Sequence, residues 1–236
     1  MKRVAKQAVL VFAWSLLATL PLAAQKGVIK IGAILAVTGP ASNLGAPEAK
    51  TLEMLVEQTN AAGGIAGRKV ELVLKDSGAS PEKALSFARQ LIEEEKVLAI
   101  LGPSTSGESM KIKDVCEEGR TILLSCAAAE TIVNPVARWV FKTPQNDAFA
   151  TRMIYQYLKD KGLTRIGVVA SNTGFGNAGK AQLEKYAPEY GIEILIAEVY
   201  DKEATDLTGV LTKLKARDVQ AVVNLSLIHI SEPTDS

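Results

Sequence analysis

The strongest constraint on this chain is a regular alternation of short apolar runs with longer stretches of helical spacing. The apolar runs are rich in β-branched residues and end at glycine, proline or small polar residues, which is typical of buried strands. They occupy residues 28–36, 68–74, 97–101, 121–126, 165–170, 192–199 and 219–225. Short connections join them to the helical patterns, so the sequence predicts an α/β fold with parallel sheets.

The alternation divides into two blocks at Thr143 and Pro144. Two such blocks predict two α/β lobes, residues 27–143 and 144–225, with a cleft between them. Ligands of parallel sheets bind beyond the carboxyl ends of the strands, and clefts between lobes commonly hold small molecules. The helices expected from spacing and capping residues are residues 48–62, a helix opened by Pro81, residues 147–161 capped by Asp147, residues 176–190, and one through residue 217 capped by Asp206.

One helix start in the first block has the features of an anion site. The apolar run at residues 97–101 ends at Gly102-Pro103, and the hydroxyl residues Ser104, Thr105 and Ser106 precede the next helical pattern. Free N–H groups and the positive end of the helix dipole both face the gap at such a start. Ser106, at or near the N-cap, can cap the helix or bind a carboxylate through its hydroxyl. An ordinary capped turn is the alternative.

Residues 1–24 have the pattern of a secretory signal peptide. Lys2, Arg3 and Lys6 precede an apolar run over residues 8–20 and a small-residue segment. The run is short for a membrane span, and a retained N-terminal anchor is the alternative. We therefore expect an exported protein.

The rest of the chain is nearly neutral. Removing the three basic residues of the leader leaves 24 of the 27 lysines and arginines against 26 acidic residues. This balance, without a basic cluster, argues against a nucleic-acid partner. Cys116 and Cys126 are the only cysteines, and the sequence leaves open whether they pair or remain separate buried thiols.

Several short motifs occur in the order found in a known family. They are Ile29-Lys30-Ile31-Gly32, Thr38-Gly39-Pro40, the segment from Asn60 to Arg68, Gly102-Pro103 with Ser106, and the segment from Trp139 to Pro144. Over about residues 27–225 the chain resembles the substrate-binding proteins of ABC importers, in the branched-chain amino-acid (Leu/Ile/Val-type) group of type I periplasmic binding proteins. The resemblance implies a two-lobed, monomeric periplasmic protein without a cofactor. It would close around an amino acid or a similar small acid and deliver it to a membrane permease.

The same resemblance assigns a carboxylate-binding role to two loops. Ser106, with its neighbour Thr105, takes the position whose hydroxyl and N–H hold the ligand carboxylate. Ala127 and Ala129 lie on a second loop that binds through its backbone. The family often has a hydroxyl residue near position 129, and alanine there removes one donor, which leaves the identity of the ligand open.

Two further positions are expected to contact the ligand by resemblance. Phe175 takes the place of an aromatic residue of the second lobe that covers the ligand, and Leu44 falls where some members carry an aromatic residue in the first lobe. A hinge is expected near Thr143. The expected mechanism is capture without chemical conversion; a ligand-sensing module of the same fold is the alternative.

The C-terminal segment, residues 226–236, departs from the pattern. It resembles translated sequencing-adapter read-through, whereas the family continues well beyond this point with residues that finish the second lobe and supply a partner for the ligand ammonium. We therefore expect a C-terminal truncation, an incomplete second lobe and a non-native tail. A short natural C-terminus is the alternative.

A competing motif occurs in the second block. Residues 174–179 fit the G-x-G-x-x-G pattern of dinucleotide-binding proteins, and Glu198 follows at a suitable distance. However, three residues separate the preceding strand from the first glycine, which in that motif makes the tight turn. A nicotinamide-dependent enzyme is therefore the weaker interpretation, and we expect the glycines to shape a ligand-facing loop around Phe175.

The sequence offers no evident catalytic or metal site. The single histidine, His229, lies in the suspect tail, and a nucleophile needs a base nearby. The acidic run at residues 93–95 is expected to be a solvated helix face. Asp76 either reaches the cleft or caps its own loop.

Overall fold

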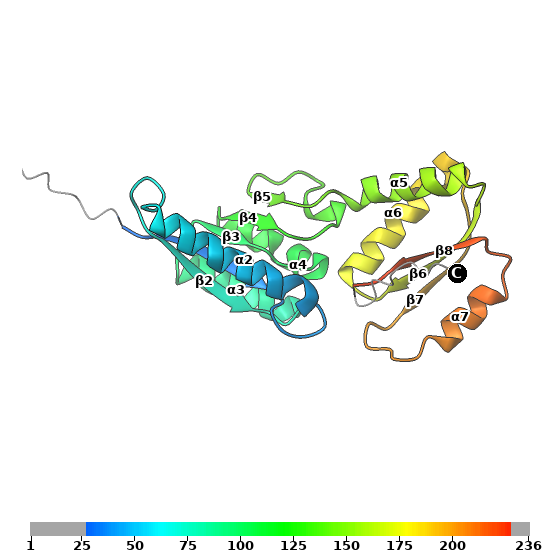
Figure 1. The fold of residues 1–236 in the computed structure, drawn as a ribbon, viewed down its shortest axis with the longest axis horizontal. Helices are drawn as coiled ribbons and strands as arrows, with labels where there is room; N and C mark the ends of the chain where they lie inside the picture. Colours follow the sequence, from blue (N-terminus) through cyan, green and yellow to red (C-terminus); the bar gives the residue numbers. More distant parts are fainter. Residues whose placement is uncertain (1–26, 228–236) are drawn as a thin grey trace, which may run out of the picture.

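The structure, a computed structural model, describes residues 27–227. The predicted leader and residues 228–236 of the predicted tail lie outside the described residues. The first lobe contains β1 (Ile29–Leu35), α2 (Ser42–Ala61), β2 (Val70–Asp76), α3 (Pro81–Glu93), β3 (Ala99–Leu101), α4 (Ser106–Glu118), β4 (Ile122–Ser125), the 3-10 turn η1 (Glu130–Ile132) and β5 (Val140–Lys142). The second lobe contains α5 (Asp147–Asp160), β6 (Arg165–Ser171), α6 (Gly174–Tyr190), β7 (Glu193–Tyr200), α7 (Thr208–Lys215) and β8 (Ala221–Leu225). The two lobes lie side by side along the long axis (Figure 1).

The first lobe is built on a parallel sheet with strand order β2-β1-β3-β4-β5. β1 lies between β2 and β3, so the chain runs from β1 to β2 on one side and then crosses back past β1 to β3 on the other. The switch point of the topology therefore falls between β1 and β3. In open α/β sheets the ligand site lies beyond the carboxyl ends of the strands at such a point.

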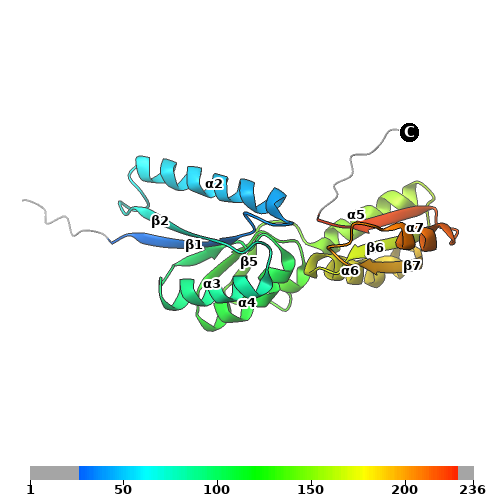
Figure 2. The same cartoon turned by 90° about the horizontal axis from the view of Figure 1, so that it is seen from below.

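Residues of β1 alternate between the two faces of this sheet. Ala33 and Leu35 pack toward α2, and Ile34 packs toward α3 and α4. Figure 2 shows α2 on one side of the sheet and α3 and α4 on the other. Because side chains alternate with a period of two along a strand, a strand that is apolar throughout needs cover on both faces. This accounts for the continuous apolar run that identified β1.

The second lobe has a smaller parallel sheet of order β7-β6-β8. Its main core lies between the sheet and the pair α5 and α6, where Tyr155, Ile166 and Leu183 are almost completely buried. The Tyr155 hydroxyl donates to the Leu183 carbonyl at 2.7 Å, which satisfies the polar end of this buried ring. α7 covers the other face through Leu214. The predicted α/β fold class with parallel sheets is confirmed.

Two elements differ from the sequence-based expectation. α2 begins at Ser42 instead of residue 48 and contains Pro47. The Gly45-Ala46-Pro47 segment suggested a loop, but packing of the first turns of α2 against the sheet outweighs the backbone hydrogen bond lost at one proline. β5 was not predicted, because its three residues lie at the edge of the sheet, pair only with β4, and are too few to show a period.

Two predicted helix caps are each displaced by one residue. Asn146 is the N-cap of α5, and Asp147 is the first helical residue. Leu207 is the N-cap of α7, although the Asp206 carboxylate still accepts the Thr208 N–H at 2.8 Å. Both aspartates thus lie at helix starts, where their charge is favourable.

A hydrogen-bonded link joins the lobes near the predicted hinge. Glu130 of η1 donates its N–H to the Asp147 carboxylate at 3.0 Å, and its own carboxylate accepts from the Gln182 amide of α6 at 2.9 Å. Within the first lobe, Lys142 donates to the Ala128 carbonyl at 2.5 Å.

Within residues 27–227, none of the helices combines the length and the hydropathy needed to cross a bilayer.

Candidate ligand-binding site

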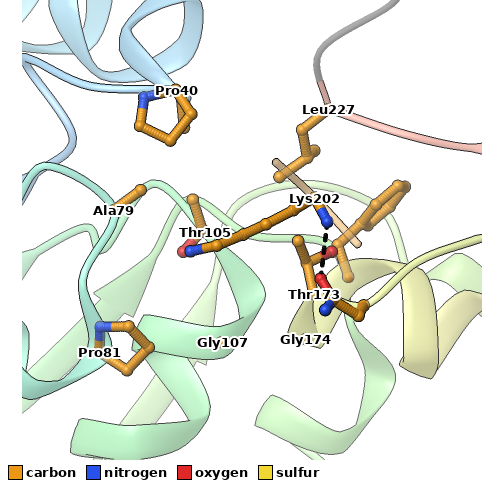
Figure 3. Close-up of a pocket in the computed structure, with 12 residues that line it drawn as sticks. Pro40, Ala79, Pro81, Thr105, Gly107, Thr173, Gly174, Lys202 and Leu227 are labelled. Atoms are coloured by element: carbon orange, nitrogen blue, oxygen red, sulfur yellow. Dashed lines mark hydrogen bonds between the residues drawn. The ribbon is translucent and has the colours of Figure 1, made fainter. Parts of the chain in front are cut away.

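A cavity of about 230 Å³ lies between the lobes, at the carboxyl ends of strands from both sheets. The first lobe contributes loop residues that follow β1, β2 and β3, and the second contributes residues that follow β6 and β7. They are Pro40, Ala41, Ala79, Pro81, Thr105 and Gly107 on one side, and Asn172, Thr173, Gly174, Phe175 and Lys202 on the other. Leu227, from the segment predicted to be non-native, also borders the cavity. Figure 3 shows these loops facing one another.

The N-termini of α4 and α6 meet at this cavity. A Cβ placed on Gly174 would lie 2.5 Å from the Gly107 Cα, so the two backbones are in contact and position 174 has room only for glycine. Each helix carries a positive partial charge at its N-terminus, and the first N–H groups have no partner within the helix. Two such ends at close range repel each other, and a negative charge in the cavity between them would relieve that repulsion.

The start of α4 is fixed by a capping arrangement that the sequence analysis missed. Thr105 is the N-cap, and its hydroxyl donates to the Glu108 carboxylate at 2.5 Å. The signal was present as Thr105-x-x-Glu108, the capping-box spacing. Because the Thr105 hydroxyl is turned to Glu108, it makes no cap bond to the helix N–H groups, which remain able to bind an anion.

Glu108 is fully buried, and this changes its acidity. Burial raises the pKa of the Glu108 carboxyl, and the hydroxyl groups of Ser77 and Thr105 offset only part of the rise, while the charge of Asp76 adds to it. One carboxyl oxygen of Glu108 has no hydrogen-bond partner among the described residues. These features favour the protonated form of the side chain.

Ser106 lies directly behind the cavity wall and does not line it. Its side chain is 1% exposed, and its hydroxyl oxygen accepts the Ala129 N–H at 3.3 Å. The Ala127 N–H donates to the Ser125 hydroxyl at 3.1 Å. The two loops expected to hold a carboxylate are therefore adjacent, and the Ser106 hydroxyl and the Ala129 N–H are hydrogen-bonded to each other in this structure.

The remaining predicted contacts divide between the cavity and its surroundings. Phe175 lines the cavity, as does Thr105. Leu44 is half-buried in the first turn of α2, outside the residues that line it. The structure thus brings Thr105 and Phe175 together at one cavity, places Ser106 and Ala129 beneath its wall, and leaves Leu44 to one side. Lys202 lines the cavity but was not singled out in the sequence.

The glycines of the 174–179 motif have packing roles. A Cβ on Gly176 would lie 2.1 Å from the Ser171 carbonyl oxygen, so glycine lets the helix approach the strand closely. The Gly176 N–H is capped by the Thr173 hydroxyl at 3.0 Å. Glu198 forms an ion pair with Lys213 at 2.7 Å. These contacts account for the motif without a bound dinucleotide.

Side-chain hydrogen bonds brace the loops of the first lobe. The Ser104 hydroxyl accepts the Ala36 N–H at 3.1 Å and donates to Glu48 at 2.5 Å. The Asp76 carboxylate accepts from both the N–H and the hydroxyl of Thr38, and from the Gly78 N–H. Burial alone would raise the pKa of Asp76, but these hydrogen bonds outweigh it and lower the pKa. Asp76 therefore caps its own loop.

The two cysteines remain separate thiols. Cys116 is buried in α4, and burial raises its pKa to about 12; burial, with a contribution from Glu48, raises the pKa of Cys126 to about 11. Neither is therefore ionised near neutral pH. Within the part of the chain that the structure describes, no group of three or more His, Cys, Asp or Glu side chains is placed to hold a metal ion.

Two parallel-sheet lobes with a cavity at the facing strand ends define a class of proteins that enclose small molecules between lobes. The profile of one such family, described as periplasmic binding protein, matches residues 28–228. The chain therefore belongs to the periplasmic binding protein family, as the motifs predicted.

Several relatives of this family are similar to the chain over most of its length. The Leu/Ile/Val-binding protein homolog 7 of Brucella suis is 27% identical over 208 residues, which are 84% of this chain and 52% of that protein. The leucine-, isoleucine-, valine-, threonine-, and alanine-binding protein of Pseudomonas aeruginosa is 27% identical over 199 residues, 82% of this chain and 52% of that protein. The chain spans about half the length of the curated relatives it matches.

A solved structure gives the same result. The branched-chain amino acid transporter substrate binding protein LivJ of Streptococcus pneumoniae, in complex with isoleucine, superposes with a TM-score of 0.74 at 28% identity. The match covers 84% of this chain and 56% of the other. It agrees with the predicted fold of parallel-sheet lobes.

Proposed function

We propose that this chain acts outside the cytoplasm, where it captures an amino acid or a similar small carboxylate in the cavity between its lobes. It then delivers the ligand to an ABC importer in the membrane. The observation that carries the proposal is the meeting of the α4 and α6 N-termini at the cavity. Both helix ends favour a negative charge there. The rest of the wall is largely apolar, which suits a small organic acid with a hydrocarbon part.

The relatives support the same assignment. Their names describe binding of leucine, isoleucine and valine, and one structure holds isoleucine. By similarity, the partner is a membrane permease that receives the ligand from the closed form. The proposal includes no chemical conversion of the ligand, in keeping with a family of binding proteins.

Calorimetric titration tests this proposal. The chain is titrated with isoleucine, leucine, 4-methylpentanoate and benzoate, and the bound compound is recovered and identified by mass spectrometry. We expect saturable binding of at least one of them and recovery of the compound unchanged. Absence of binding across the panel, or a chemically altered ligand, would contradict the proposal.

A pair of phenylalanine variants places the binding in the cavity. Phe175→Ala removes an aromatic wall of the cavity, and about a tenfold loss of affinity is expected because most of a ring's buried area is lost. Phe149→Ala, on the exposed surface of α5, is the matched control. Equal affinity for both variants would show that the ligand binds elsewhere.

A further inference from the structure

Lys202 is the only charged residue among the described residues that line the cavity. It follows β7 in the second lobe and is half-buried. In Figure 3 its side chain extends from the second lobe across the cavity, with the ammonium end toward Thr105 of the first lobe. Thr105 is the N-cap of α4, so the ammonium and the positive helix end face the same part of the cavity.

The backbone of Lys202 is held firmly in place. Its N–H donates to the Asn172 side-chain oxygen at 2.9 Å, and the Asn172 amide donates to the Asp201 carboxylate at 3.0 Å. The Asn172 N–H also donates to the Tyr200 carbonyl at 2.8 Å. These bonds tie the loop after β7 to the loop after β6. The backbone from which the Lys202 side chain extends is therefore held by contacts within the second lobe.

The ammonium has no acidic partner in the part of the chain that the structure describes. Within residues 27–227, Lys202 takes part in none of the ion pairs. The nearest acidic neighbour in sequence, Asp201, is engaged by Asn172 and by the Glu203 N–H. The first-lobe residues around the cavity include Pro40, Ala41, Ala79 and Pro81. A cation that faces such a wall loses hydration and gains from an anionic partner.

From this arrangement we infer that Lys202 is a specificity-determining residue: its ammonium binds the carboxylate of the ligand from the second lobe, opposite the N-terminus of α4. The inference rests on the proposed function and adds the chemical feature that the site selects, a negatively charged head group. One carboxylate then contacts both lobes at once. The ligand is bound more tightly by the closed arrangement than by separated lobes, and this difference is what drives closure.

The test uses ligands matched in shape but not in charge. Isoleucine, 4-methylpentanoate and benzoate are titrated into the chain. Each is compared with the alcohol in which an uncharged hydroxymethyl group replaces the carboxylate: isoleucinol, 4-methylpentanol and benzyl alcohol. Wild type is compared with Lys202→Met, which keeps most of the side-chain volume, and with Lys202→Arg, which keeps the charge. Lys215→Met, on the exposed side of α7, is the control.

We expect Lys202→Met to weaken binding of the preferred carboxylate at least tenfold and to leave its alcohol counterpart within twofold of wild type. Lys202→Arg and Lys215→Met should stay within about threefold for both. The affinity of wild type for the carboxylate should fall as sodium chloride is raised, and this dependence should shrink in Lys202→Met because one ionic contact is lost.

Three results would overturn the inference, and they separate it from the proposed function. Unchanged carboxylate affinity in Lys202→Met overturns the inference alone, and so does an equal loss for carboxylate and alcohol, which would indicate packing. Wild-type preference for the alcohols excludes selection of a negative charge. If wild type binds none of the six compounds, both the inference and the proposed function fail.

Discussion

At the scale of single residues, Ser106 connects two loops of the first lobe. Its hydroxyl accepts the N–H of Ala129, which is completely buried. A buried N–H without an acceptor has lost its hydrogen bonds to water and gains none in the folded state, which lowers the stability of the fold. The Ser106 hydroxyl therefore stabilises the fold, whether or not it also binds a ligand.

Ser106→Ala is expected to lower the free energy of unfolding by about 1–2 kcal/mol, since the Ala129 N–H is left without an acceptor. Urea denaturation followed by circular dichroism measures the change. Ser86→Ala, at an exposed position of α3, is the control and should equal or slightly exceed wild type because alanine favours helix. Coincident unfolding curves for the two variants would contradict this role.

Glu108 predicts a specific pH dependence of stability. Its pKa in the folded chain is raised by burial, so the folded state binds the proton more tightly than the unfolded state. Stability is then lost as pH rises above the ordinary glutamate pKa, and the loss levels off above the raised value. The carboxyl groups whose charges interact with that of Glu108 are those of Asp76 and Glu48. Both remain in the variant tested.

Glu108→Gln removes the titration and keeps an acceptor for the Thr105 hydroxyl. We expect the variant to gain stability relative to wild type as the pH increases from 4 to 8, with the smallest difference at pH 4. Denaturation midpoints at four pH values measure this. A difference between the two proteins that does not vary with pH would show that folding leaves the pKa of Glu108 unchanged, which would contradict this account.

At the scale of helices and strands, the glycine contact between α4 and α6 sets how closely the lobes approach. Gly174→Ala would place a methyl group 2.5 Å from the Gly107 Cα, so one backbone must move. We expect the lobes to separate, with a larger radius of gyration in X-ray scattering and a loss of ligand affinity of tenfold or more.

Gly209→Ala is the matched control for this substitution. Gly209 lies in α7 with nothing within 4 Å of its added Cβ, so alanine should raise helix stability without changing the scattering profile. If Gly174→Ala keeps the wild-type radius and affinity, the contact between the helix ends does not control lobe approach.

Most strands and helices could be predicted from the sequence. The strands are buried on both faces and therefore apolar throughout, and the helices have apolar residues at a regular helical period. The start of α2 could not be predicted, since the cost of Pro47 is local and the compensating packing against the sheet is tertiary. β5 has only three residues and no periodic signal. Its pairing with β4 is a tertiary contact at the edge of the sheet, across a connection that contains η1.

The site was predicted in part, for a related reason. Thr105 and Phe175 precede or open helices, and helix starts leave a clear mark in sequence. Lys202 lies on a loop with no motif, and its backbone is hydrogen-bonded to Asn172 of the neighbouring loop. A position of that kind follows from the relative placement of two lobes, which no local pattern encodes.

At the scale of the whole molecule, the account describes one cavity that is completed by two lobes. Glu130 and Gln182 hold the lobes together on one side through a hydrogen bond of 2.9 Å. The helix ends and Lys202 meet on the cavity side. A ligand that binds all of these groups favours closure only through the contacts that both lobes make with it.

The most direct test of this account is a nuclear magnetic resonance titration of the isotopically labelled chain with the tightest-binding carboxylate of the panel. The account predicts that the amide signals of Gly107, Gly174 and Phe175 shift together and saturate at one equivalent. Residues of both lobes would then sense the same ligand. Shifts confined to one lobe, or located away from the helix ends, would contradict the central claim that the ligand binds between the lobes.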